Sequence, residues 1–371
     1  RYQKNHLPVN AHPPTSVLFT LPFGLLPYPV AKFVWNISSL VAVAIAAVLM
    51  MSRWGLAIHS SNYWALAVLI ISSASLSSQI REAQFNAFLL LLITIGWIGM
   101  RNHWPLAAGI AIGLAAGLKL FPLFIIFAFL MLRQWKTFAY SCTAFGLLQA
   151  LTAGVFGIES YRTYIYDVMP GLSHWRAAWL NSSLTGFWSR VFDPGIDVVV
   201  PLYESPLLAK VAILGSSLVI TGLFAWQAWR AKGEVQRDRM YAAAVIAMIL
   251  LSPTAWDHYW LLLLVPLPIL WWRSEWTVPS VILFWICTFL LVVMRQYWLW
   301  VCLGTPLPQR VGGVMTNIAQ PWNSILVLAI PTYCLLVLYG LALTRRALPA
   351  DWNAAPSDER LGVSRLTLPV T

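Results

Sequence analysis

Apolar runs long enough to cross a lipid bilayer recur along this chain and limit its possible folds more than any other feature. The runs extend from Val30 to Leu343. About 20 apolar residues in a helix span the ~30 Å hydrocarbon core of a bilayer. Only helices and closed barrels satisfy their backbone polar groups in lipid. The sequence therefore predicts an all-α protein, a polytopic transmembrane helical bundle.

We expect about eleven membrane crossings, several of them shorter than a full span. They are placed at residues 30–51, 63–78, 85–100, 105–118, 120–133, 138–157, 207–229, 240–253, 259–272, 277–294 and 322–344. Residues 1–346 then form one transmembrane domain with a long external loop at 158–206. Residues 347–371 are polar and aperiodic, which predicts a disordered cytoplasmic tail.

The basic residues indicate how the chain is oriented in the membrane. The chain is 59% hydrophobic and only 10% charged, yet its net charge is +11. The basic residues are dispersed over short connectors, at Arg53, Arg101, Arg133 with Lys136, Arg230 to Arg239, Arg273, and Arg345 with Arg346. Cytoplasmic loops of membrane proteins are enriched in Lys and Arg. We therefore assign these loops to the cytoplasm and do not attribute the charge to nucleic acid binding.

The start of the chain also bears on topology. The sequence begins at Arg1 without Met, and its first residues form a polar loop. Eleven crossings and a cytoplasmic tail place Arg1 outside. A cytoplasmic start therefore predicts at least one further helix before Arg1.

Gln84 and Asn86 form the first group of candidate site residues. They lie at an external boundary and enter the next apolar run. An unpaired amide is costly in an apolar environment. Two interpretations remain open: the amides cap a helix end, or they hydrogen-bond to a polar head group or sugar.

Lys119 lies between two short apolar runs, in the stretch Gly117 to Pro122. A lysine so close to apolar sequence is costly unless it snorkels to the interface or meets an anion. Its ammonium is a compact charge that binds phosphate well. Phosphate binding and plain snorkelling are both kept as interpretations.

Asp257 and His258 follow Pro253 in another external turn. A proline breaks the helix and frees carbonyl groups, which is tolerated at depth only beside a cavity or packed protein. Histidine titrates near neutral pH, so the pair has the chemistry for proton transfer. A structural ion pair is the alternative for Asp257.

The external segment Glu159 to Pro206 interleaves aromatic residues with amides and arginines. Such a pattern fits stacking on sugars and pairing with phosphate, but it also fits an interfacial helix. We select Asn181 and Arg190 as its substrate-binding candidates. The four cysteines show no CxxC or metal-ligand spacing, so neither a disulfide nor a metal site is expected.

These clusters, in this order, resemble glycosyltransferase family 87, the bacterial polyprenyl-phosphate-mannose-dependent mannosyltransferases of the GT-C superfamily. The matching stretches are His12-Pro13-Pro14 with Leu21-Pro22 and Leu26-Pro27, Ala83-Gln84-Phe85-Asn86, Ala116 to Pro122 with Arg133-Gln134-Trp135, Asn181-Ser182-Ser183, and Leu251 to His258. The similarity covers about Arg1 to Trp272. The chain departs from the family pattern at two positions. Ala83 stands where the family commonly has Gly, and Tyr259 stands where a second His is frequent.

The resemblance implies inverting transfer of a hexosyl group, expected to be mannosyl, from a polyprenyl-phosphate donor to a lipid or glycan acceptor. The reaction is expected on the outer face of the bacterial cytoplasmic membrane, in contact with membrane lipids and without a cofactor. Family members are expected to use an Asp in the first external loop as base. Arg1 to Thr15 hold no Asp or Glu, so this base precedes Arg1 or is absent. Asp257 and His258 remain the catalytic candidates.

A transporter or flippase of lipid-linked sugars is the alternative function. Transport predicts ionisable residues near the membrane midplane and repeat symmetry. The sequence shows neither feature, because its candidate groups gather at one face.

Overall fold

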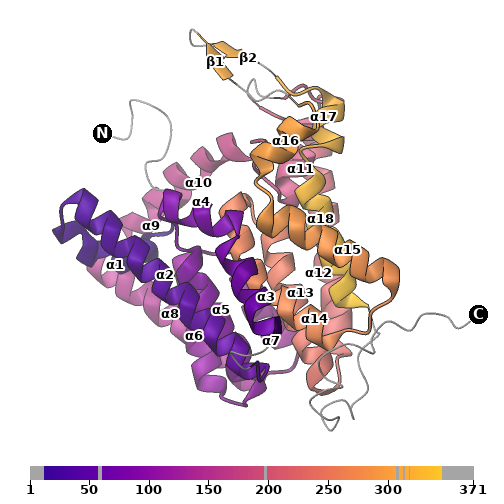
Figure 1. The fold of residues 1–371 in the computed structure, drawn as a ribbon. Helices are drawn as coiled ribbons and strands as arrows, with labels where there is room; N and C mark the ends of the chain where they lie inside the picture. The colour runs from indigo at the N-terminus through magenta and orange to yellow at the C-terminus, as the bar shows by residue number, and fades with distance from the viewer. Residues whose placement is uncertain are drawn as a thin grey trace, which may run out of the picture.

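The computed structural model is a bundle of helices with a small β-hairpin at one end (Figure 1). It describes residues 12–56, 61–195, 199–305, 309–311, 314–316 and 318–344. The predicted all-α membrane bundle is confirmed at the level of its fold class. The tail expected at residues 347–371 lies outside the described residues.

The first part of the bundle contains the helices that carry the first two groups of candidates. Its elements are α1 (Pro14–Thr20), η2 (Leu21–Leu25), α2 (Tyr28–Arg53), α3 (Ser61–Ile71), α4 (Ala74–Glu82), α5 (Asn86–Arg101), α6 (Pro105–Leu118), α7 (Leu123–Met131) and α8 (Trp135–Phe156). Prolines start several of these helices, because the first turn of a helix needs no N–H there.

The expected external segment is itself mostly helical. It contains α9 (Glu159–Thr163), η3 (Tyr164–Val168), α10 (Met169–Gly171), η4 (Leu172–Trp175) and α11 (Leu184–Phe192). The Ser183 hydroxyl caps α11 by accepting a hydrogen bond from the Gly186 backbone N–H.

The rest of the chain completes the bundle and covers one end. Its elements are α12 (Pro206–Trp229), α13 (Gly233–Leu250), η5 (Asp257–Leu264), α14 (Pro266–Arg273), α15 (Val278–Thr288), η6 (Phe289–Val293), α16 (Gln296–Cys302), β1 (Gln309–Val311), β2 (Val314–Thr316), α17 (Pro321–Leu326) and α18 (Ile330–Leu343). The strands β1 and β2 pair antiparallel.

Helices occur at the positions expected for the crossings, but few of the described helices are long enough to span a bilayer alone. Four helices are long and apolar enough to cross a membrane, at Tyr28–Arg53, Trp135–Phe156, Pro206–Trp229 and Pro321–Leu343. Two bent pairs, α3 with α4 and the α15–η6 helix with α16, would raise the number to six. The short helices α5, α6 and α7 have 16, 14 and 9 residues. Helices packed inside a bundle need not match the lipid thickness, which is why they can be short.

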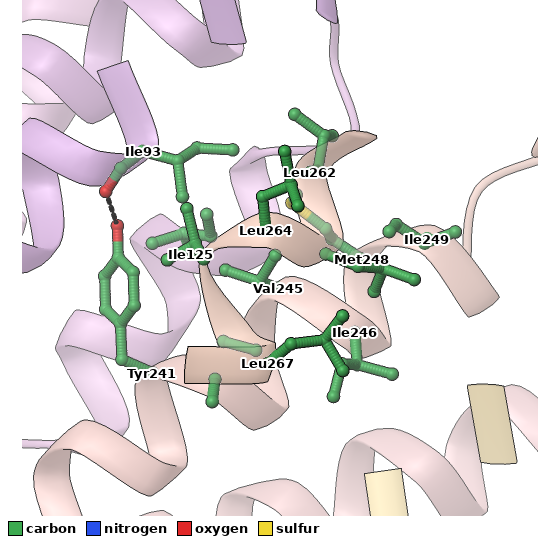
Figure 2. Close-up of a cluster of buried hydrophobic side chains, with 14 of the residues drawn as sticks. Ile93, Ile125, Tyr241, Val245, Ile246, Met248, Ile249, Leu262, Leu264 and Leu267 are labelled. Carbon is green, nitrogen blue, oxygen red and sulfur yellow. Dashed lines mark hydrogen bonds between the residues drawn. The ribbon is translucent and has the colours of Figure 1, made fainter. Parts of the chain in front are cut away.

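Helix α13 forms the centre of the bundle. Every residue from Asp238 to Leu250 is buried, as expected for a helix that is apolar nearly all round. It packs against α5, α7, α12, α14, α18 and η5. Figure 2 shows this core, where Tyr241 donates a 2.8 Å hydrogen bond to the carbonyl of Ile93 on α5.

Glycines let α6 approach α8 closely. Gly109, Gly113 and Gly117 recur at every fourth residue of α6 and face α8, and a Cβ on Gly113 would lie 2.7 Å from the Ala144 Cβ. Small residues at this spacing are typical of close helix contacts in membranes. The contact fixes the end of α6, and therefore the start of the Lys119 segment.

Candidate functional site

The α4–α5 junction positions Gln84 and Asn86. Ser73 caps the start of α4, and α4 ends at Glu82. The next residue, Ala83, has a φ of +48°, in the left-handed region. The Gln79 side chain donates a hydrogen bond to the Gln84 carbonyl. This sharp turn starts α5 at Asn86 and directs both amide side chains toward the end of α6.

Lys119 follows the last residue of α6, and its ammonium is held by neutral oxygens. Its Nζ lies 3.1 Å from Asn86 Oδ1 and 3.3 Å from Gln84 Oε1. The same atom lies 4.4 Å from the centre of the Tyr259 ring. The side chain is buried, and no carboxylate among the described residues forms an ion pair with it.

Asn86 joins the Lys119 segment to the η5 turn. Its Oδ1 accepts from Lys119 while its Nδ2 donates 2.9 Å to the backbone carbonyl of His258. Asn86 is fully buried. One amide therefore holds together the amino end of α5, the end of α6 and the start of η5.

Asp257 presents a carboxylate at the same place. Its Oδ1 accepts hydrogen bonds from Ser78 Oγ at 2.9 Å and from the His258 backbone N–H at 2.8 Å. Its Oδ2 accepts none from the described residues. The Nδ1 of His258 lies 3.6 Å from Asp257 Oδ1, which is beyond hydrogen-bond length.

The protonation of this pair follows from burial and from its hydrogen bonds. Burial is the main reason that the pKa of His258 is lowered, and the nearby Lys119 acts in the same direction. Burial alone would raise the pKa of Asp257, but His258 and the Ser78 hydroxyl outweigh it, so that pKa is lowered from its usual value. At neutral pH the site therefore holds a neutral imidazole beside an ionised carboxylate.

A cavity of about 890 Å³ opens in front of these groups. The residues that line it include His12, Ser78, Arg81, Gln84, Trp175, Trp256, Asp257, His258, Tyr259, Arg295, Trp298 and Trp300. The combination of aromatic, cationic and carboxylate side chains fits a sugar phosphate. Among the described residues, no three His, Cys, Asp or Glu side chains are grouped as metal ligands.

The structure therefore brings together five of the seven predicted site residues: Gln84, Asn86, Lys119, Asp257 and His258. Asn181 lies behind the cavity wall, where its Nδ2 donates to the carbonyls of Arg176 and Pro253. Its Oδ1 accepts from the backbone N–H groups of Ser183 and Ala255. The bonds with Pro253 and Ala255 hold the turn that leads to Asp257, and the bonds with Arg176 and Ser183 fix the segment around Asn181 itself.

Arg190 is not among the residues that line the cavity. It is fully buried, and its Nη1 donates to the carbonyls of Ala178 and Asn181. Its Nε and Nη2 have no hydrogen-bond partner in the described part of the chain. Arg190 therefore braces the backbone segment around Asn181 and does not line the cavity.

The sequence analysis did not select most of the residues that line the cavity, and three of them, His12, Ser78 and Arg295, contact or lie near its polar groups. His12 lies near Lys119 and His258, and burial, Lys119 and His258 together lower its pKa to about 3. Ser78 binds Asp257 from α4, and Arg295 Nη2 donates 3.0 Å to Ser77 Oγ at the mouth. His12 belongs to a matching motif, but nothing in the local pattern of Ser78 or Arg295 could have revealed a contact across more than 170 residues.

Comparisons with known proteins show the family to which the chain belongs. The family model described as glycosyltransferase family 87 matches residues 10–253. A polyprenol-phosphate-mannose-dependent alpha-(1-2)-phosphatidylinositol pentamannoside mannosyltransferase of Mycolicibacterium smegmatis is 27% identical over 70% of this chain and 60% of its own length. A protein of the same description from Mycobacterium tuberculosis is 26% identical over 70% of this chain and 57% of its own length.

A second protein of M. smegmatis also matches. It is described as a polyprenol-phosphate-mannose-dependent alpha-(1-2)-phosphatidylinositol mannoside mannosyltransferase, and is 23% identical over 68% of this chain and 59% of its own length. The chain thus spans about 60% of the length of the curated relatives it matches. No solved structure matches the chain at a significant level.

Proposed function

Because the chain belongs to glycosyltransferase family 87, we propose that it transfers a hexosyl group, expected to be mannosyl, from a polyprenyl-phosphate donor to a lipid or glycan acceptor. The relatives described above are mannosyltransferases that depend on polyprenol-phosphate mannose. The cavity of about 890 Å³, with aromatic walls and a cation behind it, has the size and chemistry for a sugar phosphate.

The observation that carries this proposal is the environment of Lys119. A buried ammonium costs several kcal/mol unless it is paired, and the described residues offer it only amide oxygens and an aromatic ring. Such a cation has capacity for an anionic partner from outside the chain. The phosphate of the lipid donor supplies that partner.

The reaction follows from where charge develops. The acceptor hydroxyl oxygen attacks the anomeric carbon as the bond from that carbon to the phosphate oxygen breaks, with inversion. Negative charge grows on the leaving phosphate, where Lys119 stabilises it, and one such fixed group contributes roughly 10²–10³-fold to the rate. The acceptor proton passes to Asp257, whose Oδ2 is available. His258, neutral and adjacent, is the second candidate for this base.

The remaining candidates act through other residues. Asn86 holds Lys119 and the His258 carbonyl in one arrangement, and Gln84 supports Lys119 from the other side. Asn181 and Arg190 are positioning residues, because their hydrogen bonds fix the backbone around residues 176–183 and 253–255.

We place the site on the extracytoplasmic face of the bacterial cytoplasmic membrane. Helix α5 runs from Asn86 at the cavity to Arg101 at the opposite end, about 24 Å along its axis. Arg53, Arg101, Arg133 and Arg273 lie toward the Arg101 end, which the positive-inside rule assigns to the cytoplasm.

A transfer assay tests this function. Purified full chain in vesicles is given radiolabelled polyprenyl-phosphate mannose with phosphatidylinositol mannosides, and parallel vesicles receive the glucosyl donor. We expect mannosyl transfer to fall about 10²–10³-fold in Lys119→Met. The matched control Lys136→Met, an exposed lysine at the opposite end, retains the wild-type rate.

Two results would refute the proposal. Transfer by Lys119→Met at the wild-type rate would remove the phosphate role. Scrambling of the lipid-linked sugar across the bilayer, without any transfer, would replace the enzyme with a flippase.

A further inference from the structure

A second cavity lies at the end of the bundle opposite the cavity that contains Asp257 and His258. Its volume is about 770 Å³. It is formed where the α7–α8 turn, the end of α12, the start of α13 and the end of α18 meet. The lining residues include Leu132, Arg133, Trp229, Arg230, Lys232, Gln236, Arg237, Arg239, Met240 and Thr344.

Five basic side chains and no acidic ones belong to the described lining of this cavity. The Arg133 guanidinium lies 4.2 Å from the centre of the Trp229 ring, and Arg133 has a φ of +58°. Non-glycine residues rarely adopt that conformation, so the sharp turn at Arg133 carries a conformational cost. The Nε of Arg237 is buried without a hydrogen-bond partner in the described part of the chain.

The acidic residues near this cavity pair mainly with arginines that do not line it. Glu234 forms an ion pair with Arg101 at 3.0 Å, and Asp238 pairs with Arg101 and Arg273. Glu275 lies close enough to Arg239 to act on it electrostatically. Arg239 also donates to the Leu341 carbonyl and to the Thr344 hydroxyl. Arg133, Arg230, Lys232 and Arg237 form no ion pair with a described carboxylate.

The surroundings of the cavity are those of a membrane surface. Trp135, Trp226 and Trp229 are exposed at this end, and exposed tryptophans mark the level of the lipid head groups. In α8 and α12, the spans that reach it, only 11% and 17% of the residues in the most apolar stretch are buried within the protein. Large apolar side chains on both helices, such as Leu151 and Leu218, are exposed and available to acyl chains.

We propose that this cavity binds the head group of an anionic phospholipid, with the acyl chains lying along α8 and α12. Basic pockets between helices at the cytoplasmic side of membranes bind such head groups. This lipid site is separate from the cavity that contains Asp257 and His258, and the proposal does not depend on whether the protein transfers sugars.

Native mass spectrometry of the purified full chain tests the proposal. Dioleoyl phosphatidylglycerol and dioleoyl phosphatidylcholine are added in turn, and the retained lipid is counted. We expect phosphatidylglycerol to bind at least about tenfold better. Removal of one basic side chain weakens the binding of phosphatidylglycerol about fivefold. The double variant Lys232→Gln/Arg237→Gln should therefore bind it ~25-fold more weakly.

The control is Lys136→Gln, which removes a charge at the same end but outside the cavity lining and keeps the preference. Equal retention of both lipids by the wild-type chain would overturn the proposal without any variant. So would equal losses in Lys136→Gln and in the double variant. Displacement of the lipid by millimolar inorganic phosphate would show a small-anion site instead.

Discussion

The two ends of α5 hold buried cations in opposite ways. At the Arg101 end, the buried Asp238 accepts from Arg101, from Arg273 Nε at 3.1 Å and from Trp97 Nε1 at 2.9 Å. At the Asn86 end, Lys119 has only amide oxygens and an aromatic ring. One cluster balances its charges inside the protein, whereas the other buries the Lys119 amine without an internal counterion, and this burial lowers the pKa of Lys119 to about 7.

This difference separates a structural cluster from a functional one. A balanced buried cluster fixes helices α5, α13 and α14 relative to one another and offers little to a ligand. An unbalanced buried cation is a cost to the folded protein that binding of an anion offsets. We therefore expect substitutions at the Arg101 end to change stability, and those at the Asn86 end to change activity.

The largest expected effect is at Asp238. Asp238→Ala leaves Arg101 and Arg273 buried without their carboxylate, which should lower the free energy of unfolding by about 3–5 kcal/mol. Equilibrium unfolding in SDS micelles measures it. Glu159→Ala, which removes an exposed pair with Arg162, is the control and should shift stability by less than about 1 kcal/mol. Equal effects in the two variants would show that the buried cluster is not structural.

Asp257→Asn is expected to act on activity and not on stability. Loss of the base should lower the transfer rate by roughly 10²-fold or more, while SDS unfolding stays near wild type. Transfer at the wild-type rate would exclude Asp257 as base. His258→Asn, which keeps the Asp257 carboxylate, is the matched variant, and its transfer rate should fall less.

The pH dependence of transfer distinguishes the two candidate bases. A base acts only when deprotonated, so activity falls as the pH drops through its pKa. Because the pKa of Asp257 lies below its usual 3.8, we expect no fall in rate as the pH drops from 7 to 5. Burial lowers the pKa of Lys119 to about 7, so loss of its proton lowers the rate only as the pH rises. If the rate instead fell below pH 6.5, and His258→Asn abolished that fall, then His258 would be the base.

Gly113→Leu tests the contact that sets the end of α6. A larger side chain must displace Ala144 on α8, and overpacking costs about 1–3 kcal/mol. Gly146→Leu on α8 is the control, because a Cβ there meets no described atom within 4 Å. Equal stability of both variants in SDS would show that the α6–α8 contact tolerates bulk.

The smallest expected effect is at Ala83. A left-handed conformation costs an alanine about 1–2 kcal/mol that glycine avoids, so Ala83→Gly should raise the free energy of unfolding by about 1 kcal/mol. Ala139→Gly, on the exposed side of α8, should lower it by about 0.5–1 kcal/mol. Destabilisation by Ala83→Gly would show that the turn gains from the alanine side chain.

The sequence predicted the helical bundle and the cluster of Gln84, Asn86, Lys119, Asp257 and His258, because both depend on local signals. Apolar runs predict helices wherever they occur, and a polar residue at the end of such a run stands out, as Lys119 and Asn86 do. Asn181 stands out for the same reason, but its hydrogen bonds go to backbone groups of the Pro253 turn. No local pattern distinguishes an amide that holds a turn from one that faces a cavity.

The lengths of the crossings were also beyond local prediction. Helices α5, α6 and α7 are shorter than a bilayer requires, because packing against α8 and α13 replaces contact with lipid. Nor could the sequence show the balanced cluster, since Trp97 and Asp238 are 141 residues apart. Pairing across such separations depends on the fold.

The affinity of the purified protein for polyprenyl phosphate, measured by isothermal titration calorimetry in detergent, tests the central role of Lys119 most directly. A hydrogen bond to a charged group contributes about 1.5–3 kcal/mol, so Lys119→Met should bind roughly 10–100-fold more weakly while its stability in SDS stays equal or rises. Equal affinity of the wild-type protein and Lys119→Met would contradict the account.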